Sequence, residues 1–287
     1  MTTNIYDKVT AVIVEQLEKG IIPWQKPWDF SFAGNGAFSY ATGKPYSLLN
    51  QWLLGLRKGA WLTFNQIQEA GGKIKAGEKA SFVVFWKLMD KTIINEEGEE
   101  EVVGTIPLLR SYNVWHIDQC SGIEAKKFEE PHNDVSSVEK AEKIISEYFE
   151  AEGAPTLFIE PSNEAYYAPI RDEIHVPLRE QYKDTNAFYS TLFHEMTHST
   201  GHKKRLNRGS IGDEETRNLD SYSKEELVAE IGAAYLCNVS GIDSTNILNN
   251  SVAYIQSWSR RLKEDNRLIV SAAGKAEAAV KFILGEM

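Results

Sequence analysis

The stretch His194-Glu195-Met196-Thr197-His198 decides the fold of the second half of this chain. On a helix, residues four apart lie one above the other on the same face, so both imidazoles can bind one metal ion. The glutamate between them can accept a proton from a water molecule on that ion. Three apolar residues before the pair, Phe188, Leu192 and Phe193, would share one face of a helix. They favour a helix over residues 186–199.

A catalytic zinc site needs a third protein ligand and one open position. His202 comes only four residues after the second histidine, and three imidazoles on one rigid helix cannot easily surround one ion, so it is the weaker candidate. A second helix, predicted near residues 223–238, can bring Glu226 to the metal while Glu230, one turn on, hydrogen-bonds a ligating imidazole. The two glutamates could also exchange these roles. We predict His194, His198 and Glu226 as ligands, supported by Glu230.

These residue types in this pattern point to peptide hydrolysis. Zinc is the default ion for two histidines and one carboxylate, although manganese or iron can occupy similar ligands. Zinc lowers the pKa of its bound water towards ~7, and Glu195 would take the water proton and deliver it to the leaving amine. Because the ligating imidazoles must be neutral, activity should fall in acid. Four side chains are candidate oxyanion stabilisers: Tyr222, Tyr235, His202 and His175.

The second half reads as a small sheet followed by helices. Apolar and β-branched runs predict strands at residues 156–160, 165–168 and 173–176, and helical periodicity continues near residues 245–264 and 267–284. The strand at 165–168 is either ordinary sheet or an edge strand that binds an extended peptide by β-addition.

The first half combines short helices with two aromatic strands. A first helix is predicted over residues 5–19 and ends at Gly20. Two more are predicted over residues 48–56 and 63–70, and Thr63 is the N-cap of the last. Strands are predicted over residues 81–89 and 108–117, with an acidic loop between them. The Gly- and Ser-rich stretch 31–46 reads as a mobile loop.

A charged, turn-rich stretch at residues 124–137 separates the two halves. We therefore predict an α+β protein with two domains, residues 1–130 and 131–287. The second would have a zincin-like metallopeptidase fold, in which the helix with the histidine pair lies beside a small sheet.

Charge and aromatic residues are distributed unevenly between these halves. Residues 1–95 hold 11 Lys+Arg against 7 Asp+Glu, whereas residues 131–287 hold 17 against 25, and six of the seven tryptophans precede residue 116. Aromatic rings interleaved with basic side chains suit sequence-tolerant binding of single-stranded DNA. We expect Trp52 and Trp86 in the core and Trp24 or Trp28 partly exposed. The predicted DNA-binding residues are Trp24, Lys26, Trp28, Lys44, Tyr46, Lys73, Lys75 and Lys79.

Composition excludes other classes of protein. No apolar run approaches the ~20 residues that span a bilayer, and the polar start is not a signal peptide. The two cysteines, Cys120 and Cys237, lie far apart and suit a reducing compartment. The sequence therefore predicts a cytoplasmic protein with no membrane partner.

Several separated stretches, in order along nearly the whole chain, resemble one family. The stretches are residues 20–28, 43–46 with Asn50, 61–64, 72–79, 194–202, 205–208 and 222–234. The second half resembles the zincin-like metallopeptidase domain of ArdC-type antirestriction proteins, and the first half resembles their single-stranded-DNA-binding domain.

The resemblance implies a protein of plasmids, phages or other mobile elements that binds incoming single-stranded DNA and helps it escape host restriction. Two hypotheses follow. In the first, the protein is a DNA-associated zinc metallopeptidase that cuts an unidentified protein, for example a protein of the host restriction system. In the second, it is a non-catalytic protein that protects DNA, and its metal domain is structural or docks a partner.

Overall fold

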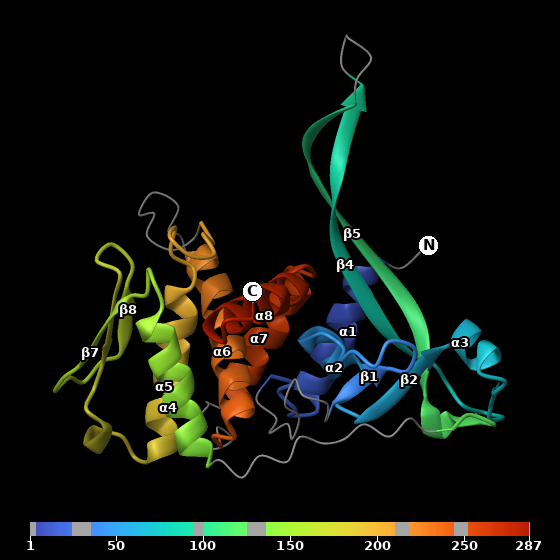
Figure 1. Cartoon of the computed structure of the whole chain (residues 1–287), viewed down its shortest axis with the longest axis horizontal. Coiled ribbons are helices and arrows are strands. Elements are labelled where there is room, and N and C mark those ends of the chain that lie inside the picture. Colours follow the sequence, from blue (N-terminus) through green and yellow to red (C-terminus); the bar gives the residue numbers. More distant parts are fainter. Residues whose placement is uncertain are drawn as a thin grey trace.

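The computed structural model describes residues 4–24, 36–94, 100–124, 136–209, 219–243 and 252–286. It is an α+β fold, as the sequence predicts (Figure 1). No helix in these ranges is both long and apolar enough to cross a lipid bilayer.

A four-stranded sheet organises the first half. Its order is β1 (Ala37–Ser39), β2 (Gly59–Thr63), β5 (Glu100–His116) and β4 (Ser81–Ile94), with β1 parallel to β2 and the other pairs antiparallel. Strands β4 and β5 continue beyond the sheet as a long two-stranded ribbon that projects from the body (Figure 1).

Two sequence predictions for this region are wrong. The ribbon strands are longer than predicted, since β5 begins at Glu100 inside the acidic stretch that was expected to be loop. Residues 37–39, expected in a mobile loop, form β1. Pairing with neighbouring strands decides both outcomes, and such pairing is not visible in local sequence.

Short helices flank this sheet. The first half contains α1 (Ile5–Glu18), α2 (Leu48–Leu53) and α3 (Phe64–Glu69), and a small sheet of β3 (Lys73–Ile74) and β6 (Cys120–Ser121). Thr63 caps α3 as predicted, in a capping box with Gln66. The side chain of Asn50 in α2 accepts from the Val84 amide at 2.7 Å and donates to the Val84 carbonyl at 2.8 Å, which ties α2 to the free side of β4.

The second half matches the predicted order of elements. Helix α4 (Ser137–Glu150) precedes a sheet of β7 (Thr156–Ile159), β9 (Glu173–Val176) and β8 (Tyr166–Ala168), in which β8 is an edge strand. Four helices follow: α5 (Thr185–Ser199), α6 (Leu219–Ser240), α7 (Val252–Glu264) and α8 (Leu268–Ile283).

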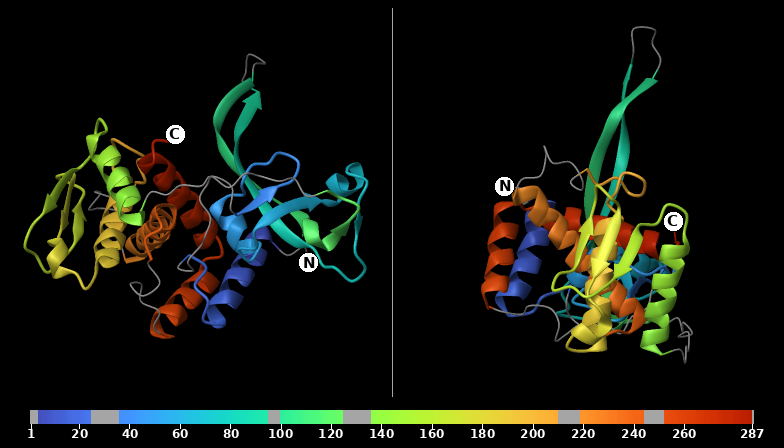
Figure 2. Two further views of the ribbon diagram at one scale, coloured as in Figure 1. Left: turned by 60° about the horizontal axis from the view of Figure 1, so that its bottom comes forward. Right: turned by 90° about the vertical axis from the view of Figure 1, so that its left-hand side faces the viewer.

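The two halves share one hydrophobic core. Helices α1 and α2 pack against α7 and α8, so the first and last parts of the chain lie side by side (Figure 2). This cluster includes Val9, Ile13, Leu17, Leu48, Trp52, Trp258, Leu262, Ile269 and Val280. The predicted domain boundary at residue 130 falls outside the described residues.

The predicted environment is confirmed for Trp52 and wrong for Trp86, and of the pair Trp24 and Trp28 the structure describes only Trp24. Trp52 is fully buried, as predicted, but Trp24 is also buried and packs 6.1 Å from Trp52 and 6.4 Å from Trp258 between ring centroids. Trp86, expected in the core, is 50% exposed on the ribbon. Trp28 lies outside the described residues.

Helices α5 and α6, which carry the predicted ligands, pack closely against each other. A Cβ atom at Gly232 of α6 would lie 2.5 Å from Cγ2 of Thr197 on α5, and Thr197 is fully buried. Glycine inside a helix costs stability of roughly 1 kcal/mol relative to alanine. The contact with Thr197 shows why α6 has a glycine here: no larger residue fits.

We expect Gly232→Ala to lower the free energy of unfolding by about 1–3 kcal/mol, because the added methyl group forces α5 and α6 apart. Gly274→Ala in α8 is the matched control, since a Cβ there meets nothing within 4 Å. This control should stabilise the protein by roughly 0.5–1 kcal/mol. Urea unfolding of both variants checks the pair, and equal behaviour would contradict the packing argument.

Candidate metal centre

Helix α5 is built so that its histidines face away from the core. Asp184 caps its first turn by accepting from the Ala187 amide at 2.9 Å. The apolar face predicted from the sequence is buried, with Phe188, Leu192 and Phe193 at 0–1% exposure. Because this face fixes the rotation of the helix, His194 and His198 project together from another side.

The predicted ligands come together. Nε2 of His194 and Nε2 of His198 lie 3.0 Å apart, and the Glu226 carboxylate oxygens lie 3.5 Å from the former and 3.3 Å from the latter. In a tetrahedral site with bonds of 2.0–2.2 Å, neighbouring ligand atoms lie roughly 3.3–3.5 Å apart. The three donors therefore fit one divalent ion. No other group of this kind occurs among the residues that the structure describes.

The site is open on one side. The side chains of His194, His198 and Glu226 retain 23%, 13% and 26% exposure, so a bound ion would keep a position that water or substrate can reach. Glu195, on the same helix turn, is buried, and burial raises the pKa of its carboxyl. A backbone hydrogen bond from Tyr167 in edge strand β8 partly opposes that rise.

The residue that supports His198 is Glu225, whereas the sequence predicted that Glu230 would hydrogen-bond one of the two ligating imidazoles. Glu225 Oε1 lies 3.6 Å from Nδ1 of His198, on the side of the ring opposite the candidate metal position. Arg208 in turn holds Glu225 through its Nε, at 3.2 Å from both oxygens, and through its Nη2, at 2.6 Å. All three side chains are nearly buried.

Arg208 also holds the end of α5. Its Nη2 donates to the Thr197 carbonyl at 2.7 Å, and its Nη1 donates to the Thr200 hydroxyl at 2.6 Å. Nearby, Nε of Arg205 donates to the Ser199 carbonyl at 2.8 Å. The last carbonyls of a helix have no partner within the helix and carry partial negative charge, so two guanidinium groups stabilise this end.

Glu230 has a different environment. Its carboxylate accepts a hydrogen bond from the Tyr254 hydroxyl, and the Trp24 indole lies beside it. Burial raises the pKa of Glu230, and the Tyr254 hydrogen bond only partly opposes this. Glu230 thus links α6 to α7 and to the first half of the chain, next to the metal centre.

Charge pairing shifts the pKa values of the ligands. Burial acts to lower the pKa of His198, but the neighbouring carboxylates of Glu225 and Glu226 raise it to about 9. Burial acts to raise the pKa of Glu226, but His194 and His198 outweigh it and hold that pKa well below its usual value. Without a metal the centre therefore holds a proton on His198 at neutral pH, and a cation can replace that proton.

Three of the four predicted oxyanion stabilisers, His175, His202 and Tyr235, have side chains that the structure describes, and none of these three belongs to the converging ligand group. His175 is stacked between Phe158 and Tyr166 on the outer face of the small sheet, with ring centroids 4.7 and 4.8 Å away. His202, also the alternative third ligand, lies 3.6 Å from Asp172. Tyr235 is buried, and nearby Glu277 and Glu286 add to the effect of burial in raising its pKa. The side chain of Tyr222 is outside the described residues.

Tyr182 is a residue that sequence reasoning missed. Its ring packs edge-on against Phe188 of α5, its hydroxyl is buried, and the charge of Glu195 adds to burial in raising its pKa. Nothing in its local sequence distinguishes it from other tyrosines.

The predicted DNA-binding residues have varied positions. Lys44, Lys73, Lys75 and Lys79 are exposed, and Lys75 donates to the Asp118 carbonyl at 2.7 Å. Tyr46 is half-buried against Trp61 and its neighbours in the core of the four-stranded sheet. Trp24 is buried, so the prediction that it contacts DNA is wrong for this structure. Lys26 and Trp28 lie outside the described residues.

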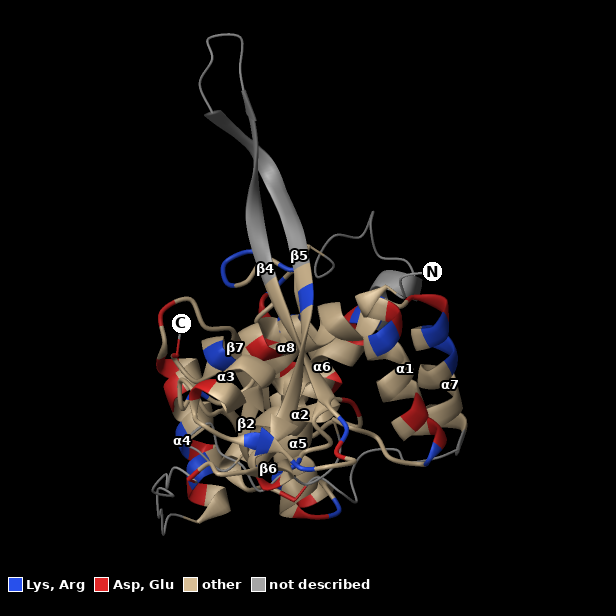
Figure 3. Cartoon of the chain, turned by 90° about the vertical axis from the view of Figure 1, so that its right-hand side faces the viewer, with Lys and Arg blue, Asp and Glu red and all other residues tan. Residues whose placement is uncertain are grey.

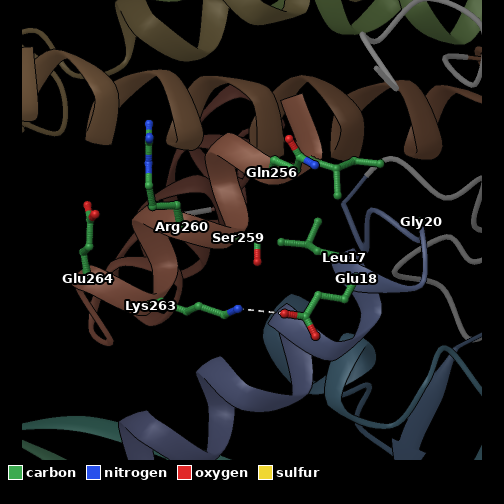
Figure 4. A pocket seen from close by; sticks show the side chains of 9 residues that line it. Leu17, Glu18, Gly20, Gln256, Ser259, Arg260, Lys263 and Glu264 are labelled. Carbon is green, nitrogen blue, oxygen red and sulfur yellow. Dashed lines mark hydrogen bonds and ion pairs between the residues drawn. The ribbon is translucent and has the colours of Figure 1, made fainter. Parts of the chain in front are cut away.

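A surface pocket of about 770 Å³ lies between α1 and α7 (Figure 4). Leu17 and Ile255 form part of its apolar lining, and the Lys263–Glu18 ion pair at 2.7 Å crosses its rim. It contains none of the predicted ligands and is separate from the metal centre.

Comparison with known proteins agrees with this geometry. The sequence model of the zincin-like metallopeptidase domain matches residues 141–275, and that of the N-terminal domain of the anti-restriction factor ArdC matches residues 3–115. Crystal structures of the antirestriction protein ArdC from plasmid R388 superpose with TM-scores of 0.69 (metal-free) and 0.72 (Mn(II)-bound). Their sequence identities are 31% and 33%, over 99% of this chain and 97–98% of theirs.

The chain belongs to the ArdC antirestriction family. It is also 32% identical, over 97% of its length, to a DNA primase TraC of Escherichia coli, but it spans only 27% of that longer protein. As a zincin-like ArdC-family domain, its second half is expected to hold a divalent metal ion at the three converging side chains.

Glu225→Gln should weaken divalent-metal binding about 10- to 100-fold, because the carboxylate that orients the His198 ring is lost. Competition with a chromophoric chelator, on protein verified as folded by circular dichroism, measures this affinity. Glu147→Gln, an exposed carboxylate on α4, is the control. Folded Glu225→Gln and Glu225→Asp variants that both bind metal like the parent would show that Glu225 does not position His198.

Metal affinity should rise about tenfold for each pH unit between pH 7 and 8.5, since metal must displace one proton from His198, whose pKa is about 9. Below pH 9 that imidazole is protonated in the metal-free protein, so lowering the pH favours the proton. The same chelator competition at constant ionic strength checks this slope. A flat profile over this range would mean that His198 is already neutral.

Proposed function

We propose that this protein is an antirestriction factor of a mobile element that binds single-stranded DNA and hydrolyses peptide bonds at a zinc centre. The observation that supports peptide hydrolysis best is the convergence of two imidazoles and one carboxylate beside a buried glutamate. Two histidines and one carboxylate favour zinc, and manganese or iron fits the same donor types.

His194, His198 and Glu226 would hold the ion, which when bound supplies Lewis acidity and an acidified water. Glu195 acts as the general base, because burial raises its pKa above the ordinary value and so makes its carboxylate a stronger proton acceptor. Glu225, held by Arg208, keeps the His198 ring in the orientation that metal binding requires.

Edge strand β8 supports a peptide as the substrate. It pairs with β9 on one side only, and its Tyr167 amide contacts Glu195, so the strand runs beside the general base. A peptide added to its free edge would gain backbone hydrogen bonds and lie across the metal centre. The substrate would be a protein of the host restriction system or another protein near the incoming DNA strand.

The support for single-stranded DNA binding is family membership together with exposed basic residues in the first half. In a second candidate function the protein protects DNA without catalysis, and its metal domain is structural or docks a partner. That candidate is favoured by the burial of Glu230 and Tyr254 next to Trp24, which makes the metal centre part of the packing between the halves.

Glu195→Gln separates the two candidates. It should keep the metal content measured by elemental analysis and the binding of a labelled oligo-dT, while peptidase activity falls about 10²- to 10⁴-fold. Glu164→Gln, an exposed carboxylate near β8, is the control and should retain activity. Transfer of unmodified DNA into a restricting host then measures protection. Full protection by Glu195→Gln would overturn proteolysis as the biological function and favour the non-catalytic protector.

A further inference from the structure

We propose that single-stranded DNA stacks its bases on one face at the root of the β4/β5 ribbon, formed by Phe85, Tyr112 and Arg110 and continued by Tyr46 and Lys44. We refer to these five residues as the ribbon-root face. The inference rests on the proposed DNA binding. It joins Tyr46 and Lys44, which the sequence predicted as DNA-binding residues, to three residues that it did not predict.

Strand register places three of these side chains on one face. Phe85 pairs with Arg110, and Val83 pairs with Tyr112. Because side chains alternate along each strand, all four project from the same side of the sheet. Val83 is buried with Trp61 and Val114. The face therefore begins in the core of the sheet and continues outward onto the ribbon.

The outer part of this face is exposed and aromatic. Phe85 is 52% exposed and Tyr112 is 45% exposed. They are diagonal neighbours across the strand pair, a relation that puts Cα atoms roughly 7–8 Å apart. Each ring thus presents a separate surface on which a base can stack without regard to sequence. Tyr46 packs against the Val83 cluster and extends the face toward β1.

Charge favours a nucleic acid as the occupant. Arg110 is the only Lys or Arg in β5. In Figure 3 the described part of that strand carries blue, the colour of Lys and Arg, and no red. It is exposed beside Phe85, and within the side chains that the structure describes it forms no ion pair. Lys44 is exposed in the segment that leads to Tyr46. Aromatic rings flanked by cations match bases and phosphates respectively.

Sequence limits the surface to the root of the ribbon. In the sequence, residues 96–101, which follow β4 and include the first residues of β5, contain five glutamates, whose charge repels phosphate. On the opposite face Phe82, Val84 and Leu109 pack on the shared hydrophobic core, while Trp86 is half-exposed. Trp86 therefore offers a control: it is an exposed ribbon aromatic of similar burial that faces the other way.

The test uses the full-length protein and a fluorescein-labelled oligo-dT, with binding followed by fluorescence anisotropy. Phe85→Ala and Tyr112→Ala should each raise the Kd about 5- to 100-fold, the effect of losing one stacked base. Arg110→Gln should reduce the slope of log Kd against log salt by about 0.7, as expected for one lost phosphate contact. Trp86→Ala should bind like the parent. Circular dichroism and metal content verify that each variant is folded.

The outcomes separate this inference from the proposed function. If the parent protein fails to bind oligo-dT, the proposed DNA binding itself is wrong. If the parent binds and the Phe85→Ala, Tyr112→Ala double variant binds equally well, the DNA lies elsewhere and only the ribbon-root face is excluded. A double variant that binds DNA normally but changes from oligomer to monomer in light scattering would instead identify this face as a contact between two copies of the chain.

Discussion

The close contact between Thr197 of α5 and Gly232 of α6 is the constraint on which the metal centre depends. Helix α5 alone provides two imidazoles, which are too few to hold a divalent ion firmly. The third donor, Glu226, comes from α6, which packs against α5 with a glycine where a larger residue would collide with Thr197. The same packing brings Glu225 behind His198. The same contact therefore bears on both the ligands and the residue that supports them.

Buried charges complete this arrangement in a way that apolar packing could not. Arg208 connects Glu225, the Thr197 carbonyl and the Thr200 hydroxyl, so it fixes the end of α5 and the orientation of His198 together. Arg205 forms an ion pair with Asp172, the residue before β9, and donates a hydrogen bond to the Ser199 carbonyl. Buried ion pairs contribute little net stability, but removal of one partner leaves a costly unpaired charge. Such pairs therefore define positions strongly, which is what a metal ligand requires.

The two halves of the chain meet in a common core, which relates the ribbon to the metal centre. Trp24 contacts Trp52 of the first half and Trp258 of α7, and it lies beside Glu230, one turn from the ligand Glu226. Asn50 of α2 then fixes the inner part of β4, from which the ribbon extends. Such a connection would relate the proposed DNA binding to the metal centre, since both would belong to one packed body.

The sequence by itself determined what depends on neighbours along the chain. Spacing of four residues placed His194 and His198 on one face of α5, and Thr63 capped α3 as its side chain predicts. Tertiary structure decided the rest. Glu225 rather than Glu230 supports His198, because helix rotation against α5 is set by packing and not by α6 itself. Trp24 is buried and Trp86 exposed, because contacts with α7 and the length of an antiparallel ribbon involve residues far apart in sequence. Local patterns encode periodicity and caps, whereas burial and partner choice depend on which distant surfaces meet.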